Sequence, residues 1–494
     1  MPIAQFKRLF DELDDNRLGH RLVVGLNYLQ NYSATENIKE IQQFADFALE
    51  FMLDIVNNSP EQYLSNTMQL KLFTFLQKTS VLVDKHCTDI ELKSTCCLSS
   101  ELGLITNIIS KESIDMVKNG IWEAYRLEQT FNQDRKEEMR NCKIKDMRYF
   151  IKTVGVKPND GYPVFIALHG GGEGEADFND VQWEKMKNYY SEHLECGIYI
   201  APRGITNTWN LHSVPESLPI YDRLIENLCI FENINLNKVY LLGFSAGSDG
   251  TYQIISHMPD RFAAANASAG HPNNCTTANW FNLPIILQVG SLDDAYNRNT
   301  VTVDYDMKIK STHQTFIHYK KPHNFIDNGP LKELQPVYSD NKEWITNSDA
   351  PHVYKNTNAP SLLINYTRNH YPSFCQWDTT TRAIKRSVNS HYWISTNDNV
   401  GLLSVDLKKN KIFIQCNLID KLNDLKILLN QKMITSDTVV TVQIYLNGIH
   451  LRDLKLECKM SNLLNTLLER GDPYYMFEYC IYVYKNKSQW DARQ

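Results

Sequence analysis

The segment from Val239 to Gly247 joins a strand-like run to a serine that has glycine on both sides. An apolar, β-branched and aromatic run stops there at the turn Gly243-Phe-Ser245-Ala-Gly247. A sharp strand-to-helix turn requires these glycines, because a Cβ at either position would clash with the neighbouring strand and helix. Residues 248–255 have a sequence that can continue as a helix. The pattern predicts that the Ser245 hydroxyl lies above the edge of a sheet, where it can act as a nucleophile.

A second strand-like run, Tyr162 to Leu168, leads into the loop His169-Gly170-Gly171-Gly172. Such a loop can turn backbone N–H groups toward an oxyanion. Acyl transfer through a tetrahedral intermediate needs two donors of this kind. The N–H of Ala246 and one N–H from Gly170, Gly171 or Gly172 are therefore the candidates for an oxyanion hole.

A carboxylate and a histidine are expected after the serine, in that order along the chain. A strand-like run from residue 284 to 289 ends in a turn that carries Asp293 and Asp294. We favour Asp293 because it is nearer the strand end, with Asp294 as the alternative. His323 lies in a loop after the next strand-like run, whereas His318 lies inside that run. We therefore predict that His323 is the base and that His318 is a structural histidine.

These segments together resemble the α/β-hydrolase superfamily of serine esterases, and most closely its branch of polyhydroxybutyrate-depolymerase-like and dienelactone-hydrolase-like proteins. The resemblance covers about a third of the chain, from near Arg148 to near Phe325. It is carried by HGGG at His169, Ala201-Pro-Arg-Gly204, GFSAG at Ser245, Ser268-Ala-Gly-His-Pro272, VGSLD ending at Asp293, and KPHNF around His323.

The resemblance implies a role for each member of a catalytic triad. Ser245 would be the nucleophile, His323 the general base, and Asp293 the residue that holds the imidazole tautomer. Trp209 and His271 lie in loops of the same region and are candidates to line a substrate pocket, as is His169. No metal and no organic cofactor is implied.

The organisation of the chain predicts three parts, in line with its 494 residues at roughly 150 residues per domain. Residues 1–142 have helical periodicity. Residues 143–335 alternate strands and helices, which predicts an α/β-hydrolase catalytic domain with a doubly wound, mostly parallel sheet. Residues 336–494 read as an irregular linker and a C-terminal β-sandwich-like domain, with a tight hairpin at Asn447-Gly448. For the helical region, packing on the sheet is favoured over a cap or a partner contact, and protein partners stay unknown.

Composition excludes some classes of partner and of site. The net charge is −6 and no basic stripe is present, so no nucleic-acid partner is expected. The N-terminus lacks the apolar run of a secretory signal and no run has the length of a membrane span, so we expect a cytoplasmic protein. Eleven scattered cysteines fit reduced thiols. His86-Cys87 and Cys96-Cys97 lack the ligand spacing of a zinc site.

The sequence thus favours a serine esterase that acts on a small-molecule or short-chain ester. One alternative is a serine peptidase of the prolyl-oligopeptidase type, although the region before residue 143 is too short for the β-propeller that usually precedes that catalytic domain. The other alternative is a catalytically silent scaffold, against which the intact set of Ser245, Asp293 and His323 argues.

Overall fold

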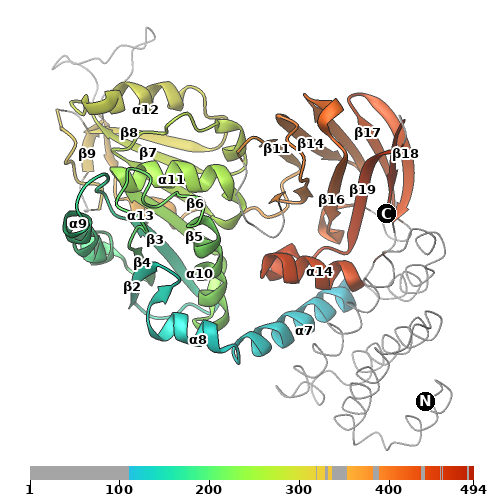
Figure 1. Ribbon diagram of the computed structural model, residues 1–494, viewed down its shortest axis with the longest axis horizontal. Helices are drawn as coiled ribbons and strands as arrows, with labels where there is room; N and C mark the ends of the chain where they lie inside the picture. The colour runs from blue at the N-terminus through green and yellow to red at the C-terminus, as the bar shows by residue number, and fades with distance from the viewer. Residues whose placement is uncertain are drawn as a thin grey trace, which may run out of the picture.

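The computed structural model describes residues 111–318, 320–328, 332–335, 353–381, 389–435, 440–456, 458, 460–486 and 489–494. Within these ranges an α/β unit and a β-rich unit lie side by side (Figure 1). The predicted helices before residue 111, and the Cys87 and Cys96-Cys97 segments, lie outside the described residues.

The α/β unit is built on a sheet of eight described strands in the order β1-β2-β4-β3-β5-β6-β7-β8. β3 to β8 run parallel to one another, whereas β1 and β2 run antiparallel at one edge of the sheet. The strands are β1 (Lys143–Ile144), β2 (Met147–Val154), β3 (Tyr162–Leu168), β4 (Gly197–Pro202), β5 (Ile234–Phe244), β6 (Ala264–Ser268), β7 (Ile285–Gly290) and β8 (His313–His318). The predicted mostly parallel sheet is confirmed.

Helices cover both faces of this sheet, because its strands carry apolar side chains on both sides. α10 and α11 share one apolar core with the sheet, and α9 and α13 share the core of the opposite face. The helices are α9 (Ala176–Tyr189), α10 (Leu218–Phe231), α11 (Ala246–His257), α12 (Arg298–Asp306) and α13 (Ala359–Leu363). α13 falls in the segment predicted as a linker, and it instead closes the core of the α/β unit.

The C-terminal unit consists of two sheets of five described strands, β11-β14-β15-β17-β18 and β12-β13-β16-β19-β20, around one shared core. The strands are β11 (Phe374–Asp378), β12 (Ser390–His391), β13 (Ile394–Ser395), β14 (Leu402–Lys408), β15 (Lys411–Cys416), β16 (Asp424–Leu429), β17 (Val440–Leu446), β18 (Ile449–Leu456), β19 (Tyr479–Asn486) and β20 (Gln489–Arg493). Asn447 and Gly448 form the predicted two-residue turn, both with positive φ. A β-rich C-terminal part is thus confirmed.

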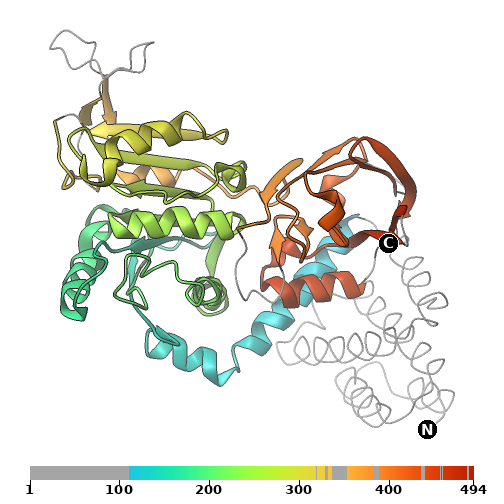
Figure 2. The same cartoon turned by 45° about the horizontal axis from the view of Figure 1, so that its top comes forward.

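Helix α7 (Lys111–Gln129) connects the two units. It runs beside α14 (Met460–Arg470) of the β-rich unit, and its other end approaches α10 (Figures 1 and 2). Lys118 Nζ lies 2.5 Å from the Glu478 carboxylate. Asn132 caps a second helix, α8 (Gln133–Arg140), so the predicted helical periodicity near residue 130 is divided between two helices. Of the region predicted as helical, α7 thus contacts both units.

Buried ion pairs join the α/β unit to the β-rich unit. The Asp472 carboxylate lies 2.7 Å from Arg368 Nη1 and 3.2 Å from Arg261 Nη1, and Arg470 pairs with Asp260. All five side chains are nearly inaccessible to solvent. Burial alone would raise the pKa of Asp472, but the Arg368 and Arg261 guanidinium groups lower it to about 2. Arg261 also pairs with Asp222 of its own unit at 2.5 Å, whereas Asp472 has its carboxylate between Arg261 and Arg368 and depends on both.

Asp472→Asn is expected to destabilise the protein by about 3–5 kcal/mol at neutral pH, because it leaves buried guanidinium groups without their carboxylate. A carboxyl group whose pKa is lower in the folded than in the unfolded protein stabilises the fold at pH values above its unfolded pKa. This stabilisation is lost as the pH falls toward the folded pKa of about 2. The difference from the wild type should therefore shrink below about pH 4. Urea unfolding across this pH range measures it, with the exposed Asp420→Asn as control. Equal stability of the two variants at pH 7 would contradict the role of the pairs.

Candidate active site

Ser245 lies between the end of β5 and the start of α11, in a strained backbone conformation with φ 57° and ψ −125°. The turn is tightly packed on both sides. A Cβ at Gly243 would lie 2.1 Å from the Gly247 carbonyl oxygen, and a Cβ at Gly247 would lie 2.1 Å from the Leu168 carbonyl oxygen. The Ser245 N–H donates to the Ser268 carbonyl at 2.9 Å. The two glycines therefore have the steric role expected from the sequence.

The structure brings Ser245, His323 and Asp293 into one hydrogen-bonded line. The Ser245 hydroxyl lies 3.0 Å from His323 Nε2, and His323 Nδ1 lies 2.8 Å from Asp293 Oδ2. Asp293 is buried at the end of β7, whereas Asp294 is exposed. Asp293, and not the alternative Asp294, is therefore the carboxylate beside the imidazole. His318 is buried inside β8, where its Nε2 bonds Gln288 Oε1 at 2.9 Å.

A second buried carboxylate anchors the loop that carries His323. Asp327 accepts hydroxyl hydrogen bonds from Tyr189 (2.9 Å), Tyr190 (2.8 Å) and Ser268 (2.5 Å). Burial raises the pKa of Asp327, and the bonds from the three hydroxyl groups oppose this shift. Sequence reasoning missed this group, since its partners are distant in the chain. The only local signal is an acidic residue four positions after His323, directly behind the apolar pair Phe325-Ile326.

The N–H groups of the glycine loop after β3 are not equally available as hydrogen-bond donors. Gly172 N–H donates to Asn179 Oδ1 at 3.0 Å and is therefore occupied. A Cβ at Gly170 would lie 3.3 Å from the Ser245 Cβ, so this end of the loop lies against the serine. The N–H groups of Gly170, Gly171 and Ala246 donate no turn, loop or cap hydrogen bond within the described part of the chain. Of the predicted donors, these three are therefore available to an oxyanion.

His169 differs from its prediction as a substrate-contact residue. Its side chain is fully buried, its Nδ1–H donates to the Gly170 carbonyl at 2.6 Å, and its Nε2 accepts the Gly204 N–H at 3.1 Å. Burial lowers its pKa to about 4, so the ring stays neutral at neutral pH. With both nitrogens bonded to backbone groups, His169 joins the glycine loop to the loop after β4 and does not contact substrate.

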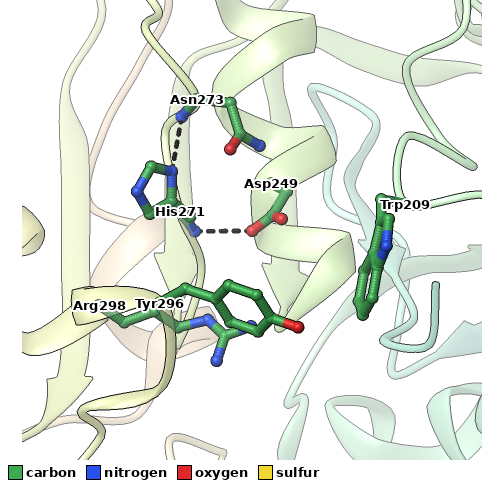
Figure 3. A pocket seen from close by; sticks show the side chains of 6 residues that line it. All are labelled: Trp209, Asp249, His271, Asn273, Tyr296 and Arg298. Atoms are coloured by element: carbon green, nitrogen blue, oxygen red, sulfur yellow. Dashed lines mark hydrogen bonds between the residues drawn. The ribbon is translucent and has the colours of Figure 1, made fainter. Parts of the chain in front are cut away.

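An open cavity of about 510 Å³ lies at the edge of the sheet where the strands end, the same edge at which Ser245 follows β5 (Figure 3). The predicted Trp209 and His271 are in its wall. Four further lining residues were not predicted, because they follow the motifs in the chain and are not part of them: Asp249, Asn273, Tyr296 and Arg298. Trp209 packs on the glycine loop, since a Cβ at Gly172 would lie 2.4 Å from its ring. The cavity is therefore continuous with the loop that borders Ser245.

Three features found in other proteins are absent from the described residues. No group of three or more His, Cys, Asp or Glu side chains there is arranged to hold a metal ion. No disulfide bond joins the cysteines in the same ranges. No described helix is long and apolar enough to cross a membrane.

A curated protein is similar to part of the chain, whereas no known family model matches it. The similarity is to poly(3-hydroxyalkanoate) depolymerase C of Paucimonas lemoignei, with 27% identity over 128 residues. The chain resembles this depolymerase. The matched segment is 24% of this chain and 30% of the relative, so the chain spans less than a third of that relative's length. The resemblance predicted from the motifs is confirmed to this extent.

Solved structures of esterases are also similar to about a third of the chain. A thermostable esterase has 21% identity and a TM-score of 0.29, and covers 35% of this chain and 50% of its own. LpqC, a poly(3-hydroxybutyrate) depolymerase from Bordetella parapertussis, has 16% identity and a TM-score of 0.29, and covers 38% of this chain and 82% of its own. Scores this low do not establish a shared fold, so the description of the fold depends on the sheet and helices of this chain alone.

Asp327→Asn is expected to lower kcat for an ester substrate by roughly 10-fold or more with little change in KM, because small displacements of a reacting group are costly. The amide keeps the shape of the carboxylate but replaces one acceptor oxygen with a donor that faces hydroxyl groups. Steady-state kinetics measures the effect, with the exposed Asp304→Asn as a matched control. A kcat equal to that of the control would contradict an anchoring role for Asp327.

Proposed function

We propose that this protein is a serine hydrolase that cleaves carboxylic esters through an acyl-enzyme on Ser245. The observation that carries the proposal is the unbroken line of hydrogen bonds from Ser245 through His323 to the buried Asp293. The similarity to a protein named poly(3-hydroxyalkanoate) depolymerase supports the same reaction, because the name denotes the cleavage of a polyester. The chemistry needs no metal and no organic cofactor.

The proposed reaction begins when Ser245 Oγ attacks the ester carbonyl carbon and its proton passes to His323 Nε2. Asp293 accepts the Nδ1–H bond, which fixes the tautomer and stabilises the imidazolium. The N–H group of Ala246 and that of Gly170 or Gly171 bind the oxyanion. The intermediate then collapses, and the imidazolium gives its proton to the leaving alkoxide. Water attacks the acyl-enzyme with the same base, which regenerates Ser245 and releases the acid.

The proposed substrate is a small-molecule or short-chain ester, because the cavity at the same edge of the sheet as Ser245 has a volume of about 510 Å³ and is open to solvent. A serine peptidase would use the same three residues on an amide. The two classes are distinguished by comparing a para-nitrophenyl ester with the para-nitroanilide of the same acid. Faster cleavage of the anilide would favour a peptidase.

Ser245→Ala is expected to reduce ester hydrolysis by about 10³-fold or more in kcat, since the nucleophile is removed. The fold should be preserved, because Ala has no larger side chain to accommodate. A fluorophosphonate probe should modify the wild type at Ser245, as mapped by mass spectrometry, and should not modify the variant. Label on another serine, or none with a folded protein, would favour the silent scaffold or a different nucleophile.

His323→Ala is expected to abolish activity about as completely as Ser245→Ala, because the members of a triad act as a unit. His318→Ala serves as the comparison, since its ring is buried between Gln288 and Phe325 and should act through stability. Kinetics and thermal unfolding on the two variants measure the difference. If His318→Ala stays folded yet loses turnover while His323→Ala keeps it, the assignment of the base is wrong.

A further inference from the structure

The open cavity at this edge of the sheet is lined by residues from four separate segments (Figure 3). Trp209 comes from the loop after β4, Asp249 from α11, His271 and Asn273 from the loop after β6, and Tyr296 and Arg298 from the segment after β7. All these segments lie at the carboxyl ends of the strands or directly follow them. Ligands of open α/β sheets bind at this edge.

The cavity extends between the two sides of the proposed catalytic site. At one side, Trp209 packs on Gly172 of the glycine loop. At the other side, Arg298 Nη1 lies 3.6 Å from Asp293 Oδ1, the carboxylate oxygen that does not bond His323. A molecule whose ester lies at Ser245 can therefore extend into the cavity.

Arg298 has a buried donor without a partner. The residue is 7% exposed, yet its Nε has no hydrogen-bond partner among the described residues. Its other contacts are a long bond from Nη1 to the Ala295 carbonyl at 3.4 Å and packing of the guanidinium carbon 4.9 Å from the Tyr296 ring centre. A buried charged donor left unpaired is unfavourable. Nε itself has almost no accessible surface. Nη2 keeps accessible surface and has no hydrogen-bond partner among the described residues, so an acceptor oxygen of a ligand in the cavity can reach the guanidinium through Nη2.

The charges of the wall favour a neutral oxygen over an anionic one. Asp249 lies in the same cavity, where burial raises its pKa and the His271 N–H donates to its Oδ1 at 2.6 Å. Asp293 adds a second carboxylate beside Arg298. A ligand carboxylate would meet these two acidic groups, whereas a carbonyl or ether oxygen would not be repelled.

The mouth of the cavity is aromatic. Trp209 and Tyr296 are 48% and 63% exposed, and their ring centres lie 6.0 Å apart in an edge-to-face arrangement. Exposed rings of this kind offer apolar contact to the body of a ligand. The cavity thus combines an aromatic entrance with a cationic donor in its wall.

We propose that this cavity is a substrate subsite in which Arg298 binds a neutral oxygen, a carbonyl or ether, in the part of the ester beyond the scissile bond. The inference rests on the proposed ester hydrolysis. It defines the substrate class as esters that carry a second oxygen function on their acyl or alcohol part, and it makes Arg298 a specificity-determining residue.

The experiment compares two pairs of esters that differ by one oxygen function. For the acyl part the pair is para-nitrophenyl levulinate and para-nitrophenyl pentanoate, and for the alcohol part it is methoxyethyl acetate and butyl acetate. The wild type should prefer the oxygenated member of at least one pair by about 10-fold or more in kcat/KM, as expected for one added charge-assisted hydrogen bond. Arg298→Met should reduce that ratio to about 1, because it removes every donor while keeping an unbranched side chain.

Arg298→Lys separates binding from the effect on Asp293, since it keeps the positive charge but removes the planar guanidinium fork. The readout is the ratio of kcat/KM within each pair of esters, which should fall in this variant whatever happens to the absolute rates. A wild-type ratio near 1 in both pairs would overturn the proposal without need of any variant, as would a ratio that Arg298→Met leaves unchanged. Absence of turnover on all four esters, together with no fluorophosphonate label, would instead contradict the proposed hydrolase function.

Discussion

The strained backbone at Ser245 is the constraint on which the rest of the site depends. A residue other than glycine in this conformation costs on the order of 1–3 kcal/mol, and it persists only when its surroundings enforce it. Here Gly243 and Gly247 allow strand, turn and helix to pack without room for a Cβ. The hydroxyl is therefore oriented toward His323 before any substrate binds, which is the preorganisation that a nucleophile requires.

Ser268 connects the serine turn to the histidine loop. Its carbonyl accepts the Ser245 N–H, and its hydroxyl donates to Asp327 in the loop that carries His323. Because Ser268 ends β6, which pairs with β5 and β7, a single strand end sets the positions of both loops. The distance between Ser245 Oγ and His323 Nε2 is therefore determined by the sheet and not by two independent loops.

Much of the fold could be predicted from the sequence because its signals are local. Buried parallel strands are short apolar runs, and the turn at Ser245 and the hairpin at Asn447-Gly448 are specified by their own residues. Asp293 was separable from Asp294 by its nearness to the strand end. His169 was mispredicted because its neighbours form the glycine loop, and nothing nearby reveals that its ring turns inward to the Gly204 N–H.

Features that depend on distant contacts could not be predicted. The α13 helix reads as part of a polar, irregular segment, and its role is visible only once Ala359 and Leu363 are seen in the core beneath β6. The cavity residue Arg298 belongs to no motif, and its role follows from its position beside Asp293 in the folded chain. Such groups acquire their role from the folded arrangement of several segments.

Two buried carboxylates illustrate how neighbours decide the role of the same side chain. Asp472 lies among guanidinium groups that lower its pKa, so it stays ionised and joins the two units as a charge. Asp327 is equally buried but bonds hydroxyl groups, and burial raises its pKa. Hydrogen bonds from hydroxyl groups fix the orientation of a carboxyl group without adding a net positive charge near His323. A guanidinium at this position would disfavour the imidazolium on which the proposed reaction depends, so the hydroxyl environment suits a loop that must carry a general base.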